Sequence, residues 1–352
     1  MFVGKACHRD SLHLIVQKPR IGEVMKKIIC GVMATFSLMT AAHAQSLCVF
    51  DLSGAGGDIY STMQDYAVVA KSWDVDFKLK AYTDEALVVK DLKSGKCDAA
   101  AISGIRAREF NNFTGSIDAV GGITDNLSAK IALTLMSNPK LAPDMVKGDY
   151  EVAGVTTVGT LYLMVKDRSI NTIQKMAGKT LGILEYDKAD YILIEKIGAI
   201  PVGMDLAGFG TQFNSKKIDI APLLPLMFKP FELYKGLGTQ GAIVRFPILL
   251  FTGDIIIRQD KFPEGYGQKS RTWFSTQIDQ QLTTSKRLEA GIPVKYWIDI
   301  PEADKLAYTK IIREARLSLT HQKILDKKMM GILKRVRCRV DPTNYECKTN
   351  DE

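Results

Sequence analysis

The feature that most constrains this chain is a strand–helix–strand–helix–strand pattern that occurs twice. In the first copy, a buried run at 47–52 precedes a glycine-rich turn, and apolar residues recur at helical spacing from Asp58 onward. An alternating stretch at 75–81, a helix opened by Asp84 and a third strand at 97–103 complete the copy. Because helical crossovers force the joined strands to run parallel, this copy predicts a small parallel sheet flanked by helices.

The second copy has the same order of elements. Strands are expected at 180–184, 200–204 and 218–224, with helices over 189–197 and from Asp205 to about residue 216. The third strands of the two copies are also similar in sequence. The start of the first reads Lys-Cys-Asp-Ala-Ala and the start of the second reads Lys-Ile-Asp-Ile-Ala. The alternative is a chance likeness of two strand–helix runs. Two similar halves predict an α/β protein with two lobes.

Two strand-rich stretches at 151–167 and 241–258 lie outside this pattern. Their positions suit chain crossings between the lobes, which would make them the hinge. The chain looks helical from about residue 270, with an apolar stripe from Leu306 and a basic stretch at 327–335 that is expected to be a solvated helix face. We expect lobe I to comprise 45–157 plus about 245–270, lobe II to comprise 158–244, and a helical C-terminal segment to comprise 271–352.

The segment at 25–44 has the features of a secretory signal peptide. Met-Lys-Lys is followed by an apolar run at 28–39 and by Ala-His-Ala, which predicts cleavage after Ala44 and a periplasmic protein. The apolar run is short for a membrane anchor, which is the alternative. Residues 1–24 fit no part of a signal peptide, so we expect them to be an extension of the gene model. Leu47 stands where a lipoprotein needs a small residue, which argues against a lipid anchor.

Composition excludes two broad classes of protein. Hydrophobic residues make up 46% of the 352 residues and charged residues 24%, as in ordinary globular proteins, so disorder is not expected. The net charge is +8, and residues 1–44 carry six basic and two acidic residues, which is half of that excess. The rest is spread without the clustered basic stripe that a nucleic-acid partner needs.

The cysteines predict disulfides. Of six cysteines, four remain after residue 44, and an even number in an oxidising compartment favours pairing. Cys338 and Cys347 would close a short loop. The expected strand order 2-1-3 places strand one beside strand three, so Cys48 and Cys97 lie near the starts of neighbouring strands. The alternative is four buried thiols. No metal site is expected, because no CxxC pair exists and His321 is the one histidine after residue 44.

The chain lacks the residues that common catalysts need. No GxSxG sequence occurs, and His321 lies in a charged C-terminal helix, where it is expected to be a surface residue. The glycine run at 54–57 lacks the third Rossmann glycine and a Walker lysine. It could present backbone N–H groups to an anion or a polar ligand at the start of a helix, or it could be a simple turn. We therefore expect neither an enzyme nor a cofactor.

Ligands of open parallel sheets bind at the carboxyl ends of the strands, beside the first strand. Arginines at such ends could hold an anionic group, and carboxylates could hold a cationic one. Each such residue alone is more often a cap or a surface charge, but together at equivalent sites they favour a cleft. The candidate ligand-binding residues are Asp58, Ser103, Arg106, Arg108, Tyr162, Tyr186, Asp187 and Asp205.

These segments together resemble a known group. The chain is similar to solute-binding proteins related to the substrate-binding component of tripartite ATP-independent periplasmic (TRAP) transporters, and within that group to the AdeT-type proteins. The resemblance spans most of the chain after residue 44. It is carried by the stretch 50–122, which includes 94–98, 104–108 and 113–118, and by 176–180, 198–202 and 261–265.

The resemblance implies a two-lobed fold like the type II periplasmic binding proteins. It implies capture of a small solute by hinge closure and delivery to inner-membrane transporter subunits, by a protein expected to be a monomer. Gly182 stands about where the transporter family commonly has a carboxylate-binding arginine, so a neutral or cationic solute is favoured. Some AdeT-type proteins carry the label of resistance-nodulation-division efflux components in aminoglycoside resistance. An accessory or drug-binding role is therefore the alternative, but no run of about 20 apolar residues after residue 44 could make the chain a pump.

Overall fold

One mixed sheet of ten strands runs through residues 44–352, the part of the chain that this computed structural model describes. Its main path has the order β2-β1-β3-β9-β5-β8-β6-β7, and two short strands pair at its margins, β4 with β5 and β10 with β9. The predicted extension and signal peptide lie outside the described residues, apart from Ala44. The strands are β1 (Gln45–Phe50), β2 (Phe77–Tyr82), β3 (Ala99–Ser103), β4 (Val146–Lys147), β5 (Tyr150–Val165), β6 (Thr180–Leu184), β7 (Ile200–Met204), β8 (Ile220–Leu223), β9 (Ala242–Arg258) and β10 (Trp297–Ile298).

The repeated pattern forms two similar groups of three parallel strands. In the first group β1 pairs with β2 and β3, and in the second β6 pairs with β7 and β8. The predicted two-lobed α/β fold is confirmed, and the order 2-1-3 recurs in both halves. The crossover helices are α2 (Asp58–Ala70) and α3 (Glu85–Lys93) in the first half, and α7 (Lys188–Lys196) and α8 (Gly208–Asn214) in the second.

The aspartate shared by the starts of the two third strands has the same structural role in each half. Asp98 lies just ahead of β3, and its carboxylate accepts hydrogen bonds from the backbone N–H of Ser46 at 2.7 Å and from the Ser46 hydroxyl at 2.8 Å. Asp219 lies just ahead of β8 and binds the N–H and hydroxyl of Thr180, both at 2.8 Å. Each half thus ties the start of its first strand to the start of its third with the same pair of contacts.

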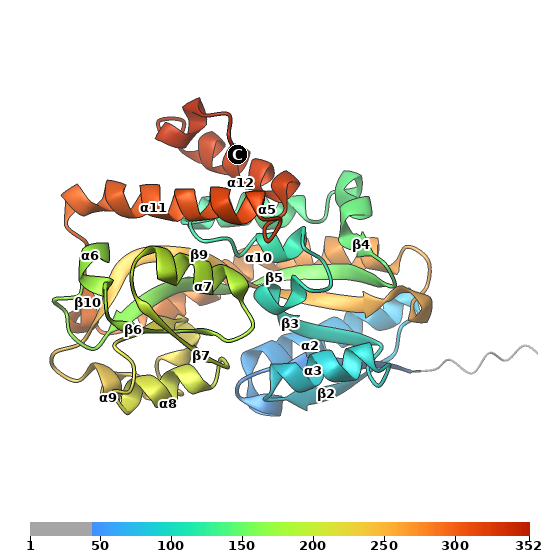
Figure 1. Cartoon of the computed structure of the whole chain (residues 1–352). Helices are drawn as coiled ribbons and strands as arrows, with labels where there is room; N and C mark the ends of the chain where they lie inside the picture. Colours follow the sequence, from blue (N-terminus) through green and yellow to red (C-terminus); the bar gives the residue numbers. More distant parts are fainter. Residues whose placement is uncertain (1–43) are drawn as a thin grey trace, which may run out of the picture. The chain divides into compact units, whose positions relative to one another are not determined.

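The strands β5 and β9 join the two groups. They pair antiparallel from Tyr150 opposite Arg258 to Val165 opposite Ala242. At one end β9 pairs with β3, and at the other β5 pairs with β8, so that the pair runs between the two groups (Figure 1). Both stretches outside the repeated pattern are therefore long strands. On the edge that faces away from the β5–β9 pairing, β9 pairs with the first group and β5 pairs with the second.

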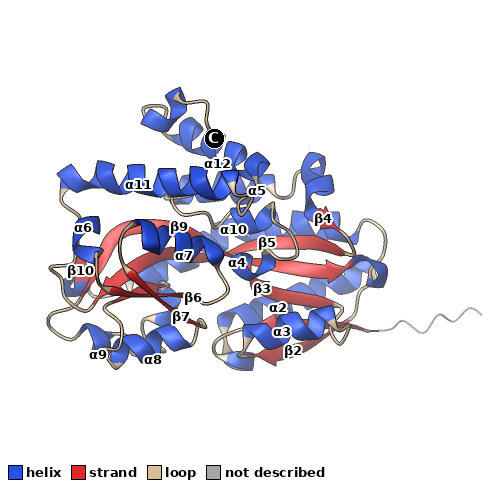
Figure 2. Cartoon of the chain, in the orientation of Figure 1, coloured by secondary structure: helices blue, strands red, loops and turns tan. Residues whose placement is uncertain are grey.

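Apolar side chains cover both faces of this sheet. In β1, Cys48 and Phe50 join one hydrophobic cluster while Leu47 and Val49 join the other, as the alternation of side chains along a strand requires. A third cluster surrounds β6 and β8. Helices lie on both sides of the strands (Figure 2), which explains why the parallel strands are apolar on both faces.

The longest helix, α10 (Tyr266–Ala290), packs along β5. Phe274 on its buried face lies over Gly154 of β5, where an added Cβ would be 2.2 Å from the aromatic ring. Glycine is needed at this position because any side chain would push the helix off the strand. The remaining helices of eight or more residues in the described part of the chain are α5 (Asn126–Leu135), α11 (Glu302–His321) and α12 (Lys327–Val340), so the C-terminal segment is helical as predicted.

Two disulfides join the cysteine pairs that the sequence analysis preferred. Cys48 of β1 is bonded to Cys97, 49 residues later, and Cys338 is bonded to Cys347, 9 residues later. Loop-closure entropy in the unfolded chain suggests that the first bond stabilises the fold by about 4 kcal/mol and the second by about 3 kcal/mol.

The C-terminal helices differ from prediction at two positions. Leu306 of α11 is 53% exposed, although it was expected to belong to the buried stripe, whose later members Ala315 and Leu319 are buried. Lys334 of α12 was expected on a solvated face, but it is 9% exposed and its ammonium group donates a hydrogen bond to the Thr349 carbonyl at 2.6 Å. The chain after α12 folds back over Lys334, while Lys327, Lys328 and Arg335 are exposed as expected.

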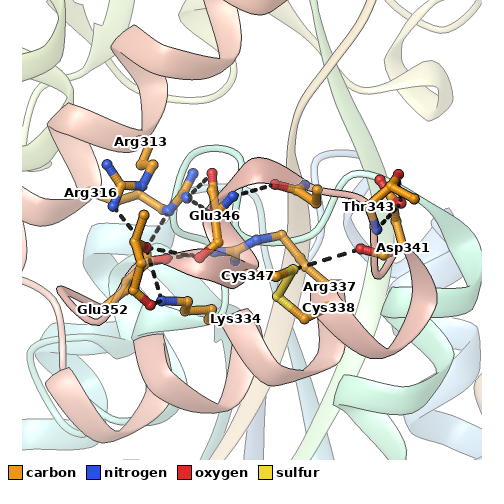
Figure 3. The surroundings of a disulfide bond; sticks show 12 residues. Arg313, Arg316, Lys334, Arg337, Cys338, Asp341, Thr343, Glu346, Cys347 and Glu352 are labelled. Atoms are coloured by element: carbon orange, nitrogen blue, oxygen red, sulfur yellow. Dashed lines mark hydrogen bonds and ion pairs between the residues drawn. A yellow bond between two sulfur atoms is a disulfide. The ribbon is translucent and has the colours of Figure 1, made fainter.

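The chain end is held by a buried cluster of charges (Figure 3). Arg316 of α11 and Arg337 of α12 bind the two carboxylate oxygens of Glu346, at 2.8 Å and 2.6 Å, and both also bind the Glu352 carboxylate. The same arginines donate to the carbonyls of Val120 and Gly122, at 3.1 Å and 3.0 Å. The second disulfide lies beside Glu346, so it helps to hold this carboxylate between the two helices.

Acidification should weaken this cluster. Burial opposes the charge of Glu346, but the guanidinium groups of Arg316 and Arg337 outweigh it and lower its pKa below the usual 4.5. A carboxyl group whose pKa is lower in the folded than in the unfolded state stabilises the fold above its unfolded pKa. That contribution is lost as the pH falls through the folded value.

We predict that Glu346→Gln lowers the free energy of unfolding at pH 7 by about 3 kcal/mol, because it removes one of the two carboxylates that neutralise the buried Arg316 and Arg337. The difference from the unmodified protein should shrink as the pH falls below the unfolded pKa of about 4.3 and through the lower folded pKa, at which Glu346 itself loses its charge. Urea unfolding at pH 7, 4.5 and 3 measures this. Asp76→Asn, which removes a surface pair with Lys71, is the control and should cost less than about 1 kcal/mol. A constant difference at all three pH values would contradict the assignment.

Candidate ligand-binding site

A cleft of ≈ 710 Å³ opens at the carboxyl ends of the parallel strands. It is lined by residues that follow β1, by Ser103 at the end of β3, and by Leu224 and Pro225 after β8. Parts of β5 and β9 and of the helices α2 and α10 complete its walls. Both halves of the molecule therefore contribute to one cleft. Its volume lies within the range of about 300–1,000 Å³ that is usual for small-molecule sites.

The glycine run before α2 is filled by the chain's own carboxylate. Asp51 accepts hydrogen bonds from the backbone N–H groups of Ser53, Ile59 and Tyr60, at 2.8, 2.9 and 3.0 Å. A Cβ at Gly57 would lie 1.9 Å from this carboxylate, which is why glycine is needed there. The predicted cradle of N–H groups thus exists, but an internal anion occupies it. The start of α2 is not free to bind an anionic ligand.

One face of α2 presents free carboxylates to the cleft. Asp58, Thr62 and Asp65 recur at helical spacing and line the cleft. Asp58 and Asp65 are exposed, and within residues 44–352 neither side chain forms an ion pair or a hydrogen bond. The sequence analysis identified Asp58 from its place at a strand end, but it gave no reason to choose Asp65.

The facing wall is a polar stripe along α10. Its members are amides and hydroxyls that recur every three or four residues, while the opposite face of the helix is buried against β5. A polar stripe of this kind is indistinguishable in sequence from a solvated helix face, so sequence analysis missed it. The stripe consists of Gln277, Gln280, Gln281 and Thr284, with Trp273 at one end.

Two buried polar atoms of this wall lack partners. The side-chain carbonyl of Gln281 accepts a weak hydrogen bond from the Thr157 N–H at 3.4 Å. The Gln281 amide nitrogen and the Thr157 hydroxyl oxygen are buried and have no hydrogen-bond partner among the described residues. Both residues line the cleft. A ligand in the cleft could satisfy such groups, because buried polar atoms are rarely left unpaired.

The buried acid Asp254 adds little negative charge to the cleft. This residue of β9 lines the cleft and is 0% exposed. Burial, with a smaller effect from the nearby Asp118, raises the pKa of Asp254 to about 8 against the opposing effect of the Thr114 hydroxyl. Near neutral pH the carboxyl of Asp254 is therefore largely protonated. The negative charge of the cleft that has no partner among the described residues comes from Asp58 and Asp65 instead.

Of the eight candidate residues, Asp58 and Ser103 line the cleft. Ser103 is buried at the end of β3, where its hydroxyl accepts the N–H of Arg106 at 3.2 Å and its own N–H donates to Glu85 at 2.6 Å. Its side chain therefore caps the short helix α4 (Gly104–Ala107).

Four other candidates bind one another between the halves and are not among the residues that line the cleft. Arg108, which follows α4, donates to the Asp187 carboxylate at 2.8 Å. The guanidinium of Arg106 lies 3.2 Å from the ring centroid of Tyr186, whose hydroxyl donates to Glu85 at 3.0 Å. We call these five residues the interlobe latch. The strand ends do face each other as expected, but their charges pair with each other.

Burial shifts the ionisation of the latch. It raises the pKa of Glu85, and the hydrogen bonds from Ser103 and the charge of Arg106 oppose this only in part. Burial and the negative charge of Glu85 raise the pKa of Tyr186 well above its usual value. The Tyr186 hydroxyl therefore stays protonated and donates a hydrogen bond to Glu85.

The two remaining candidates have structural roles. Tyr162 of β5 is 5% exposed and packs edge-on against Trp297, with ring centroids 5.0 Å apart. Asp205 accepts the N–H of Gly208 at 2.7 Å. It therefore caps a turn, and α8 begins at Gly208 instead of at Asp205.

Gly182 of β6 leaves no room for a long side chain. An added Cβ would lie 3.0 Å from both Phe209 and Ile218. This glycine lines a separate apolar cavity of ≈ 100 Å³ and is not among the residues that line the cleft. An arginine at this position could not be accommodated without a shift of its neighbours.

Two kinds of feature are absent from the described residues, a membrane-spanning helix and a metal-binding cluster. Between residues 44 and 352, no helix has both the length and the apolar character needed to cross a bilayer. The same residues contain no cluster of three or more histidine, cysteine or acidic side chains that could hold a metal ion.

Comparison with solved structures shows the fold. A TRAP periplasmic solute-binding protein from Desulfovibrio salexigens with bound orotic acid superimposes with a TM-score of 0.70 at 11% identity, covering 84% of this chain and 99% of that one. One from Haemophilus influenzae with bound L-gulonate gives a TM-score of 0.69 at 14% identity, covering 83% of this chain and 99% of that one.

Comparison of sequences shows the family. The "Probable solute-binding protein AdeT1" of Acinetobacter baumannii is 50% identical over 304 residues, which cover 86% of this chain and all of that protein. "Probable solute-binding protein AdeT2" of the same organism is 30% identical over 66% of this chain and 98% of its own length. A family model described as "Solute-binding protein AdeT 1/2" matches residues 67–352. The chain therefore belongs to the AdeT 1/2 family of solute-binding proteins.

Proposed function

We propose that this protein captures a small solute in the cleft by closure of its two lobes and delivers it to an inner-membrane transporter. The observation that carries the proposal is the cleft itself, which both three-strand groups line at the carboxyl ends of their strands. A solute bound there would contact both lobes at once. It would therefore bind the closed arrangement better than the open one and shift the population toward closure.

We place the hinge in the strands β5 and β9. The lobes are then 45–157 with about 245–270, and 158–244, while 271–352 packs as a helical segment. Two of the three irregularities in the β5–β9 register fall between Thr157 and Gly159 and between Leu161 and Leu163, at the proposed boundary. Bulges bend strands and disrupt the ladder locally, so this is where bending should require the smallest change in hydrogen bonding.

We place the mature protein in the periplasm as a monomer, after removal of residues 25–44 as a signal peptide. Two disulfides support an oxidising compartment. The names of the solved structures describe periplasmic proteins.

We further propose that the protein binds its solute without transforming it and needs no cofactor. Membership of a solute-binding family supports this. The accessory role in drug efflux or aminoglycoside resistance stays a prediction, and calorimetry with an aminoglycoside would test it.

The proposal predicts that at least one small solute stabilises the mature protein, residues 45–352, without being altered. A thermal-shift screen of metabolites measures this, and a ligand at a hundredfold its Kd should add about 2.7 kcal/mol of stability. Mass spectrometry of the recovered ligand is the control for turnover. A screen in which no compound shifts the melting temperature, or in which the stabilising compound is converted, would contradict the proposal.

The latch should favour the closed arrangement. Arg108→Gln removes the charged partner of the buried Asp187, so the lobes should open more readily and the Kd of the ligand found by the screen should rise about tenfold, which corresponds to about 1.4 kcal/mol. Calorimetry measures the affinity, and small-angle scattering should show a larger radius of gyration for the ligand-free variant. Lys93→Gln is the matched control, because its surface pair with Glu109 lies within lobe I. An Arg108→Gln protein with unchanged affinity and scattering would refute the latch.

A further inference from the structure

We propose that the solute carries a protonated amine, which binds between α2 and α10. This inference rests on the proposed function and narrows it to a chemical class. The cleft offers three features that together select an amine: free carboxylates, an aromatic ring and unpaired polar atoms.

The first of these features is the pair of carboxylates of Asp58 and Asp65. Both face the cleft from α2, and neither is neutralised by an ion pair within the described residues. No basic residue of α2 lines the cleft, and Asp51 already occupies the N-terminal N–H groups of this helix. An acidic ligand would meet three carboxylates on this wall with no positive charge beside them. A cationic ligand would meet two free partners.

The ring of Trp273 and the polar groups beside it complete the site. Trp273 of α10 lines the cleft next to α2, since its ring centroid lies 5.3 Å from that of Tyr66. Indole faces attract cations, particularly where water is excluded. The unpaired hydroxyl of Thr157 lines the same cleft and can accept a hydrogen bond from an ammonium group. This hydroxyl points to a ligand independently of the carboxylates.

The two basic residues of the cleft lie at its other end. Arg287 lines the cleft from the same helix as Trp273, fourteen residues further along, which is about 21 Å of helix. Lys229 is close to Arg287, because its ammonium group is 4.0 Å from the Cβ position of Gly291, one turn later. Neither forms an ion pair in the described part of the chain. Neither is paired with the carboxylates of α2, and both could bind an acidic group at another point of the same solute.

This assignment separates the chain from the solved structures of the same fold. The ligands named for two of those proteins, orotic acid and L-gulonate, are acids without an amine group. The difference in ligand class follows from this chain's own side chains, and the shared fold does not oppose it.

Calorimetry with defined probes tests the inference. The probes are putrescine and spermidine as amines, L-lysine as an amine that also carries an acid, L-gulonate and orotate as acids, and D-galactose as a neutral sugar. We expect at least one amine-bearing probe to bind and both acids and the sugar to fail. Asp58→Asn and Asp65→Asn should each raise the Kd of that probe at least tenfold. Glu264→Gln, an exposed acid outside the cleft, should leave the Kd unchanged.

The outcomes separate the two levels of the proposal. Tight binding of an acid or a neutral sugar, or an amine affinity that survives both aspartate substitutions, overturns the amine assignment and leaves solute binding intact. A failure of every probe here and of every compound in the wider thermal-shift screen overturns solute binding itself. Melting temperatures of the two variants in the absence of ligand, which should match the unmodified protein, exclude misfolding as the cause of a lost affinity.

Discussion

The antiparallel pairing of β5 with β9 is the constraint on which the rest of the structure depends. Each three-strand group could hold its own small sheet, but only this pair makes them one continuous sheet, with β3 on one edge and β8 on the other. The carboxyl ends of both groups therefore meet at one cleft. The register of the pair is irregular at three points, and irregularities of this kind bend a strand and disrupt its ladder locally.

The polar residues at the strand ends divide into paired and unpaired groups. Asp51 is held by the start of α2, and the latch residues bind each other between the lobes. Asp58 and Asp65 remain without partners, in the same cleft as a buried hydroxyl that is also unpaired. Paired charges stabilise the arrangement of the lobes, whereas unpaired ones are available to a ligand. This division is the physical basis for assigning the cleft to an amine.

Much of the fold could be predicted from sequence because it depends on local periodicity and on repetition. The strand and helix positions, the order 2-1-3 and the pairing of Cys48 with Cys97 all follow from the repeated pattern. The site was harder to predict. Strand ends could be located, but whether Arg108 would meet a ligand or Asp187 depends on how two distant segments approach each other. The polar stripe on α10 could not be predicted because its composition is the same as that of a solvated helix face. Only its contact with the cleft distinguishes it.

The distance between the two lobes in solution tests the central claim most directly. Fluorescent labels on cysteines introduced at Ala55 and Lys235, exposed residues that belong to the two different proposed lobes, would report it by single-molecule energy transfer. The account predicts two distances in the ligand-free protein and a shift of the population to the shorter one as the solute saturates the cleft. A single distance that does not respond to a saturating solute would show that the lobes do not close on it.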